Sequence, residues 1–219
     1  MVVELVGPAG VGKTTLAREL ERTEPDVDVG LSLWGLPRFQ LVRSAIALAP
    51  TILEVSLRKG PLRWDEIGHM IRLDALRYVI RRRNSPDRVI VLDEGPVFGL
   101  SWLDVSFARR GVRAPAAWRR RALKRWAPLL DSVVLLDVHH AEIATRIRTR
   151  AKPHRIKRSS DCTIQRFTAQ FRDAFDNVVR DLRRTRQVRV AQIRTDGSLE
   201  HNTARLKVAL ARSRNGHGH

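Results

Sequence analysis

The chain of 219 residues contains a single cysteine, Cys162, and a single tyrosine. One cysteine excludes an intrachain disulfide and a metal site built from several thiolates, and we expect Cys162 to be a partly buried, small apolar side chain. Long apolar runs are also missing, because the longest candidate, Ser44–Leu57, is too short to span a membrane and carries Glu54. The first residues, Met1–Val6, lack the basic leader of a secretory signal. We therefore expect a soluble, cytoplasmic protein with no membrane partner.

Acidic side chains are scarce relative to basic ones, with 23 Asp and Glu against 41 Lys and Arg and a formal net charge of +18. Most of the excess is arginine, whose planar fork of donors suits phosphate and carboxylate oxygens. It is concentrated in the runs Arg119–Arg125, Arg146–Arg158 and Arg180–Arg189. The charge is compatible with an acidic small substrate or with a solvated surface that has no partner. Nucleic-acid binding is disfavoured but not excluded, because no nucleic-acid motif and no interleaved aromatic residues accompany the charge.

Apolar patterning predicts strands that alternate with helices along the whole chain. The expected strands are Val2–Val6, Asp26–Leu33, Arg88–Leu92, Ser132–Val138 and Gln187–Arg194. The expected helices are Lys13–Arg22, Leu41–Leu57, Arg63–Arg83, Leu100–Arg109, Ala114–Trp126, Ala141–Arg150, Cys162–Thr185 and a last one that ends near Arg212. Pro50 should start, end or kink the second of these helices. This alternation indicates one α/β domain over residues 1–212, with a central parallel sheet of about five strands flanked by helices. Residues 213–219 are expected to form a disordered tail.

A glycine-rich turn follows the first strand and fits the phosphate-loop pattern G-x-x-x-x-G-K-[ST] at every constrained position. The glycines let successive backbone N–H groups point into one concavity, and the next helix directs the positive end of its dipole there. We expect Lys13 to bind the β and γ phosphates, the Thr14 hydroxyl to bind Mg²⁺ and Thr15 to lie near the α phosphate. The expected nucleotide-binding residues are Gly7, Pro8, Ala9, Gly10, Val11, Gly12, Lys13, Thr14 and Thr15. The pattern predicts a nucleoside triphosphate but not the reaction, since kinases, ATPases and GTPases share it.

Two acids, Asp93 and Glu94, follow the apolar strand that ends at Leu92. Right-handed crossovers would bring this strand end to the same sheet edge as the phosphate loop. An acid in that position binds Mg²⁺ or takes the proton of the attacking hydroxyl. Asp93 is therefore expected to bind the metal or the acceptor, and Glu94 to act as general base or as an acceptor ligand. The chain has no N-K-x-D guanine signature, and this favours ATP over GTP.

With these motifs, the chain resembles thymidylate kinases and the wider family of nucleoside and nucleotide kinases. The likeness rests on Val3–Leu16, Arg72–Arg82, Val89–Gly95, Leu135–Arg150 and Ile193–Leu206. The resemblance implies a P-loop kinase fold with a helical basic lid at residues 146–160 and a loop at residues 195–198 that packs beside adenine. It also implies that lid arginines, with Arg150 and Arg155 the preferred pair, close over the transferred phosphoryl group.

Two departures separate the chain from thymidylate kinases. The acids Asp93-Glu94 stand where that family has Asp-Arg, and the Arg-Pro-Gly acceptor loop is replaced by Leu31–Arg38. Thymidylate is therefore not carried over as the substrate. The candidate acceptor contacts are Trp34, Arg38, Arg72 and Arg77. The tryptophan would either stack on a substrate ring or pack in the core, and the arginines would either bind an acceptor or be solvated.

The sequence therefore favours a kinase that moves the γ-phosphoryl group of Mg-ATP to a small hydroxyl or phosphate acceptor, either nucleoside-like or another metabolite. The catalytic candidates are Lys13, Asp93, Glu94, Arg150 and Arg155, and the metal candidates are Thr14 and Asp93. The alternative is a P-loop ATPase or nucleotide-dependent regulator that binds an acidic partner through its arginine-rich surface. The expected partners are ATP and a small acceptor, and a homodimer stays open.

Overall fold

A single parallel sheet forms the centre of the computed structural model, which describes residues 1–85, 87–149, 156–185 and 188–215. Its strands are β1 (Val2–Val6), β2 (Val27–Asp28), β3 (Val89–Leu92), β4 (Ser132–Asp137) and β5 (Arg189–Arg194). They lie in the order β2-β3-β1-β4-β5, and every neighbouring pair is parallel. The α/β class and the five-stranded parallel sheet expected from the sequence are confirmed.

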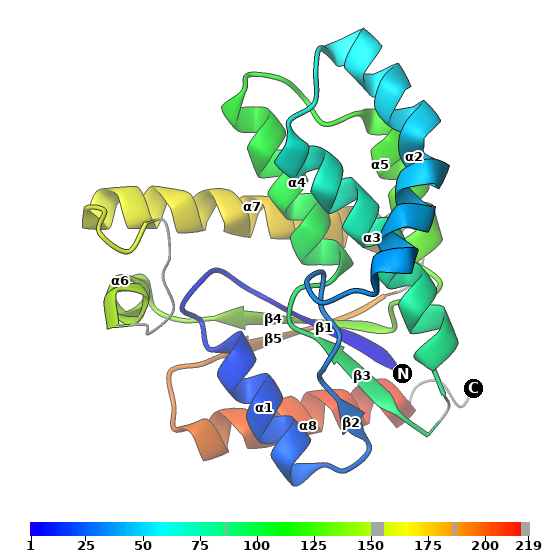
Figure 1. Ribbon diagram of the computed structural model, residues 1–219. Coiled ribbons are helices and arrows are strands. Elements are labelled where there is room, and N and C mark those ends of the chain that lie inside the picture. Colours follow the sequence, from blue (N-terminus) through cyan, green and yellow to red (C-terminus); the bar gives the residue numbers. More distant parts are fainter. Residues whose placement is uncertain (86, 150–155, 186–187, 216–219) are drawn as a thin grey trace.

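Helices cover both faces of this sheet (Figure 1). In the described ranges they are α1 (Lys13–Thr23), α2 (Arg38–Lys59), α3 (Trp64–Arg83), α4 (Pro96–Arg109), α5 (Ala116–Trp126), α6 (His140–Thr149), α7 (Asp161–Thr185) and α8 (Leu199–Asn215). α1 and α8 lie together on one face, whereas α3, α4, α5 and α7 lie on the other. α2 packs on α3 as an outer layer.

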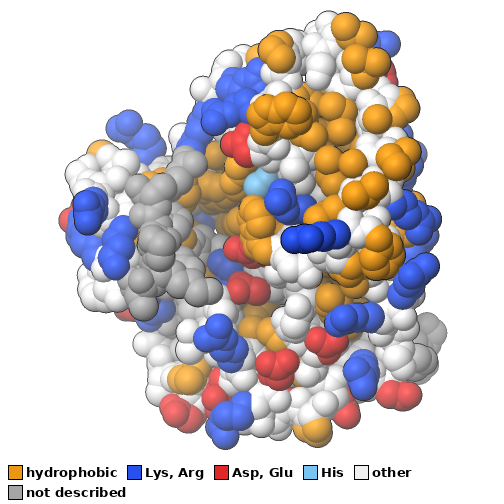
Figure 2. Space-filling model, in the orientation of Figure 1, with side chains coloured by type: hydrophobic (Ala, Val, Ile, Leu, Met, Phe, Trp, Pro, Cys, Tyr) orange, Lys and Arg blue, Asp and Glu red, His pale blue; other side chains and the backbone are white. Residues whose placement is uncertain are grey.

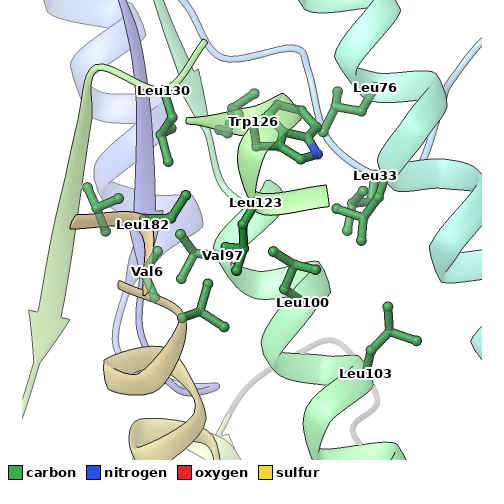
Figure 3. Close-up of a cluster of buried hydrophobic side chains, with 14 of the residues drawn as sticks. Val6, Leu33, Leu76, Val97, Leu100, Leu103, Leu123, Trp126, Leu130 and Leu182 are labelled. Atoms are coloured by element: carbon green, nitrogen blue, oxygen red, sulfur yellow. The ribbon is translucent and has the colours of Figure 1, made fainter. Parts of the chain in front are cut away.

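The hydrophobic core consists of two clusters, one on each face of the sheet. All five residues of β1 are buried, as expected for a central strand of a parallel sheet. The larger cluster lies between the sheet and the helices α3, α4, α5 and α7, and Figure 3 shows Val6, Leu100, Trp126 and Leu182 packed within it. The smaller cluster contains Leu16 and other residues under α1 and α8. The rigid core therefore supports the loops that follow the strands.

The central position of β1 determines where those loops meet. β1 pairs with β3 on one side and with β4 on the other, so the strand order reverses beside it. In open parallel sheets ligands bind at the carboxyl ends of the strands, at this reversal. The loop after β1 is the phosphate loop, and the loop after β3 carries Asp93 and Glu94.

Several boundaries differ from those expected. β2 is an edge strand of two residues, because the Asp28 carboxylate accepts a hydrogen bond from the Gly30 N–H at 3.0 Å and the chain leaves the sheet. α8 continues to Asn215, three residues past its expected end, and the Ser213 hydroxyl donates to the Ala209 carbonyl at 3.0 Å. Cys162 is exposed rather than partly buried, because it lies in the first turn of α7.

The helix α2 corrects the expectation that no segment has the length of a membrane span. It runs unbroken through Pro50, which neither starts nor ends it. By length and composition alone, Arg38–Arg58 could cross a membrane, and 22% of its apolar window is buried within the chain. The sequence pattern missed this because the apolar run that was considered, Ser44–Leu57, leaves out the first turns of the helix, which contain Phe39 and Val42.

Candidate functional site

A cavity of about 960 Å³ opens at the carboxyl edge of the sheet. Figure 2 shows the face with this hollow, between α4 and the side of the molecule that carries α6 and the start of α7. The phosphate loop and the acids after β3 line one part of it, and side chains of α4 and α7 line the other. The structure therefore brings the expected donor residues into a space large enough for two small ligands.

The phosphate loop makes a tight turn between β1 and α1. Gly10 and Gly12 have φ values of 87° and 97°, a left-handed conformation that side chains with a Cβ rarely adopt. The Lys13 ammonium donates to the carbonyl of Gly7 at 2.7 Å and to that of Pro8 at 3.3 Å. Every expected nucleotide residue from Gly7 to Thr15 lines the cavity. The loop thus presents one side-chain cation and the start of a helix to the same space.

The two expected metal residues are in direct contact. The Thr14 hydroxyl donates to Asp93 Oδ2 at 2.6 Å. The other carboxylate oxygen, Oδ1, is buried and accepts no hydrogen bond from the described residues. A buried carboxylate oxygen without a partner is costly, and a hydroxyl with a carboxylate is the oxygen set that Mg²⁺ uses beside nucleotide phosphates. The residues present therefore fit a Mg²⁺ ion.

Glu94 lies next to this pair and also lines the cavity. Its backbone carbonyl accepts a hydrogen bond from the Leu33 N–H at 3.1 Å, which fixes the loop after β3 against the segment after β2. Asp93 is committed to Thr14, so the two acids have different surroundings. The Thr14–Asp93 pair therefore fits a metal site, and Glu94 lies beside it in the same cavity.

A third carboxylate, that of Glu4 in the middle of β1, holds the loop after β3 and the start of α4 by hydrogen bonds. It is fully buried and accepts hydrogen bonds from the N–H groups of Gly95, Val97 and Phe98 at 3.1, 2.8 and 2.8 Å. A Cβ added to Gly95 would lie 2.8 Å from the Glu4 carboxyl carbon, so only glycine allows this approach. Burial raises the pKa of Glu4 to about 7, while the three N–H donors and the charge of Lys13 act in the opposite direction.

This raised pKa predicts a pH dependence of stability. Between the ordinary pKa of 4.5 and about 7, the folded chain holds a proton on Glu4 that the unfolded chain releases, so stability falls as pH rises through this window. Glu4→Gln removes the titration. We expect the unfolding free energy of the wild type, relative to this variant, to fall by about 2–3 kcal/mol between about pH 5 and about pH 8. Urea unfolding at both pH values measures it.

The control for this prediction is Glu21→Gln, which changes an exposed acid on α1. It should follow the pH slope of the wild type. A constant difference between the wild type and Glu4→Gln across the pH range would contradict the assignment.

The loop after β5 closes the cavity on the far side of the phosphate loop. The Thr195 hydroxyl donates to the carbonyls of Val11 and Asp137 at 2.9 and 3.1 Å. The Arg146 guanidinium donates to the Thr195 carbonyl and to Glu142, both at 2.8 Å. Gly197, Leu199 and Asn202 also line this side. The loop expected beside adenine is therefore tied to the phosphate loop by side-chain hydrogen bonds.

The lid residues expected to act in catalysis, Arg150 and Arg155, lie outside the described residues. Two arginines of the preceding helix are described. Arg146 lines the cavity, whereas Arg148 pairs with Asp161 at 2.5 Å. Of these two, Arg146 is the one next to the phosphate loop.

None of the acceptor residues expected from the sequence, all of which lie within the described ranges, lines the cavity. The Trp34 ring packs edge-on against His69, with Arg72 stacked over it at 4.7 Å. Arg77 is buried in an ion pair with Asp74 at 3.2 Å, and Arg38 is exposed at the start of α2. These four side chains therefore lie outside the lining of the cavity.

Aromatic side chains of α4 and α7 form one wall of the cavity instead. The wall consists of Phe98, Trp102, Phe167, Phe171 and Phe175. The three phenylalanines of α7 recur every four residues and contact one another, with ring centroids 4.9 and 5.8 Å apart. This spacing was visible in the sequence, but it equally fits a helix packed in the core. A few polar side chains, Arg63, Asp65, Ser106 and Arg109, complete the lining.

The Trp102 ring of this wall packs against the His69 side chain. It stacks face to face on His69, with centroids 3.7 Å apart and planes inclined by 2°. His69 is buried, and its Nδ1 lies 2.9 Å from the Asp65 carbonyl. Burial lowers the pKa of His69, so the ring is neutral at pH 7 and its Nδ1 carries the proton. The stack fixes the indole plane of Trp102 before any ligand binds.

Much of the arginine surface is occupied by contacts within the chain. Arg119 pairs with Asp104 at 3.1 Å and with Asp181. Arg172 donates to the Asp137 carboxylate at 2.6 Å and to the Val138 carbonyl at 3.1 Å. These contacts join α4, α5, α7 and β4. Part of the basic excess thus stabilises the fold and is not free to bind an external acidic partner.

Comparison with known proteins finds solved structures that share the fold of this chain. No family model matches the sequence, and no curated protein matches it significantly. Solved structures of deoxyadenosine kinase from M. mycoides match over the whole length at low identity. The form with the products dCMP and a flexible dCDP has a TM-score of 0.59 and 12% identity over 97% of this chain and 100% of that chain. The dATP-bound form has a TM-score of 0.56 and 12% identity over 96% of this chain and 100% of that chain. The dCTP-bound form has a TM-score of 0.52 and 11% identity over 97% of this chain and 100% of that chain. The chain therefore shares the P-loop fold of a deoxynucleoside kinase.

Proposed function

We propose that the chain is an ATP-dependent phosphotransferase that moves a γ-phosphoryl group to a small hydroxyl or phosphate acceptor. The observation that carries the proposal is the contact between Thr14 and Asp93 at 2.6 Å beside Lys13, in one cavity with an aromatic acceptor wall. An ATPase needs the first part alone. The second part, a preformed apolar chamber next to the phosphates, supports a second substrate.

The residues divide the work by position. Lys13 and the N–H groups of the phosphate loop hold the β and γ phosphates. Thr14 and Asp93 would hold Mg²⁺, and the bound ion would offset the charge of the β and γ phosphates. Glu94 accepts the proton of the acceptor hydroxyl. Arg146, which lies next to the phosphate loop, stabilises the negative charge of the phosphates.

The aromatic wall indicates the shape of the acceptor. Rings bind planar or apolar groups by offset stacking and edge contacts, and Trp102 is already fixed by its stack on His69. The polar side chains Arg63, Asp65 and Arg109 provide hydrogen-bonding groups at the same end. A nucleoside-like or other cyclic acceptor with a free hydroxyl meets both requirements, in line with the nucleotides bound by the M. mycoides enzyme.

The proposal is tested by measuring ADP release from Mg-ATP across a panel of nucleosides, nucleotides, sugars and aromatic alcohols. Asp93→Asn serves as the blank. Release that rises with one acceptor class, with the phosphorylated product identified by mass spectrometry, supports the kinase. Release that rises only with an added protein, and with no acceptor, would support the regulator instead.

The acceptor wall gives a prediction about specificity. Trp102→Leu should raise the KM of the acceptor about fivefold, because the loss of a stacking ring costs about 1 kcal/mol, while the KM of ATP stays unchanged. Steady-state kinetics with each substrate varied in turn measure both constants. Trp64→Leu is the matched control, since Trp64 is 87% exposed and does not line the cavity. An equal rise in both KM values for Trp102→Leu would count against an acceptor wall.

A further inference from the structure

The helix α2 is apolar on two opposite faces. One face, with Leu48 and Val55, is buried where α2 packs on α3. The other face exposes large apolar side chains, each with between 59% and 77% of its surface in solvent. These residues are Phe39, Val42, Ile46, Leu53 and Leu57, which we call the α2 stripe. Figure 2 shows the hydrophobic side chains gathered over this helix.

The α2 stripe follows the helical repeat. Its members and the exposed Pro50 recur at intervals of three or four residues from Phe39 to Leu57, so they lie in one line along the helix. A helix that is apolar all round is normally buried on all sides. Scattered exposed apolar residues need no explanation, but a contiguous line of this length marks a surface that another molecule covers.

The spacing of the apolar residues in the stripe is nearly the same when the helix is read in either direction. About a point level with Leu48, Phe39 lies opposite Leu57, and Ile46 lies opposite Pro50. Val42 and Leu53 are opposite one another to within one residue. A two-fold interface requires this kind of self-complementarity, since each residue meets its counterpart on an identical surface.

The charges beside the stripe obey the same symmetry. Arg43 and Glu54 lie on the same flank of the stripe, about equally far from Leu48. Arg43 lies over the Tyr78 ring at 4.1 Å and Glu54 pairs with Arg58 at 3.4 Å, and both side chains stay exposed beside these contacts. In an antiparallel pair of helices the same flank of each copy faces the other, so Arg43 of one copy meets Glu54 of the second. Near the axis, Ala47 and Ala49 are exposed, and small side chains there let the two backbones approach closely.

We propose that the α2 stripe is the interface for a second copy of this chain, with the two α2 helices antiparallel about a two-fold axis level with Leu48. In a parallel pair the flanks that carry Arg43 and Glu54 would lie on opposite sides of the two helices, so neither charge would have its counterpart beside it. A lipid bilayer would have to accommodate three exposed charged side chains on this helix, Arg43, Glu54 and Arg58, of which Glu54 and Arg58 pair at 3.4 Å within the chain. The self-complementary stripe and its charge pair therefore favour the homodimer.

The first test is the mass in solution, measured by sedimentation equilibrium over a range of concentrations. The wild type should have twice the chain mass of 25.0 kDa, and Ile46→Glu should be a monomer with unchanged circular dichroism. Val208→Glu is the matched control, because Val208 is a 52% exposed apolar residue on α8, outside the stripe. It should remain dimeric. A monomeric wild type, or an Ile46→Glu variant that stays dimeric, would overturn the proposal.

The second test addresses the orientation. Arg43→Glu and Glu54→Arg should each weaken the dimer at least tenfold in Kd, and the double variant should recover most of the loss. Sedimentation with phospholipid vesicles distinguishes the other occupant. Vesicle binding by a monomeric wild type that Ile46→Glu abolishes would overturn the dimer in favour of a membrane.

Cysteine crosslinking adds a geometric check. Cys162 is the sole cysteine, so Cys162→Ser gives a background without thiols. In this background Ala49→Cys, near the axis, should form a disulfide-linked dimer under mild oxidation. Phe39→Cys should not, because 18 helical residues separate the two copies of position 39 by about 27 Å. Crosslinking at position 39 would indicate a parallel pair and overturn the antiparallel arrangement.

Discussion

Lys13→Ala should lower the rate of phosphoryl transfer about a thousandfold and weaken ATP binding. Its ammonium is held by the Gly7 carbonyl at 2.7 Å, so it lies over the mouth of the loop where phosphate oxygens would bind. A preorganised charge at developing negative charge contributes about 10²- to 10³-fold to kcat. Lys13 also contributes to ground-state binding of the triphosphate, so both kcat and affinity should fall. ADP release and calorimetric titration with ATP measure the two effects.

The matched control for this variant is Lys124→Ala, which removes an exposed lysine of α5 outside the cavity. It tests whether the loss of one positive charge from a chain with net charge +18 affects ATP binding non-specifically. We expect unchanged kinetics. Unchanged ATP affinity in Lys13→Ala would refute the assignment of the phosphate loop.

Asp93→Asn should lower kcat at least about a hundredfold and raise the Mg²⁺ concentration needed for half-maximal rate. The amide keeps the size of the side chain, and its oxygen can still accept the hydrogen bond from Thr14, which is 2.6 Å long in the wild type. What it loses is the negative charge, and with it the second anionic oxygen that is buried without a partner among the described residues. The effect should therefore fall on the metal rather than on the fold.

Thermal unfolding in the absence of nucleotide separates these explanations. Because a buried carboxylate oxygen without a partner is destabilising, Asp93→Asn should be at least as stable as the wild type. The control Asp176→Asn, at an exposed position of α7, should leave both the rate and the Mg²⁺ dependence unchanged. A slow Asp93→Asn enzyme with the Mg²⁺ dependence of the wild type would mean that Asp93 acts on the acceptor instead.

The sheet and the donor side of the site could be predicted from the sequence because their signals are local. A phosphate loop is a run of consecutive residues, and the acids after β3 directly follow an apolar strand. The strand ends then meet because parallel strands share one carboxyl edge. Neither inference needs knowledge of how distant helices pack.

The acceptor side could not be predicted in this way. Its wall combines Trp102 of α4 with Phe171 of α7, and nothing in the sequence indicates that these helices face one cavity. The same ambiguity applies to Arg77, a candidate acceptor contact whose helix carries both solvated and buried arginines. Its ion pair with Asp74 is a burial effect that helical periodicity does not reveal. Glu4 was visible as an acid inside an apolar strand, but its three N–H partners come from a loop more than ninety residues away.

The Glu4 anchor has a consequence for how the two halves of the site can change. β1 leads into the phosphate loop, and the Glu4 carboxylate in the middle of β1 accepts hydrogen bonds from the first turn of α4. The same helix carries Trp102. One short strand therefore sets the distance between donor and acceptor. The acceptor rings can be exchanged without moving this reference point, so new specificities can be built on α4 and α7 while the transfer geometry is conserved. Replacement of α4 with a helix from another protein of this fold would succeed only if its first turn still offered its N–H groups to this carboxylate.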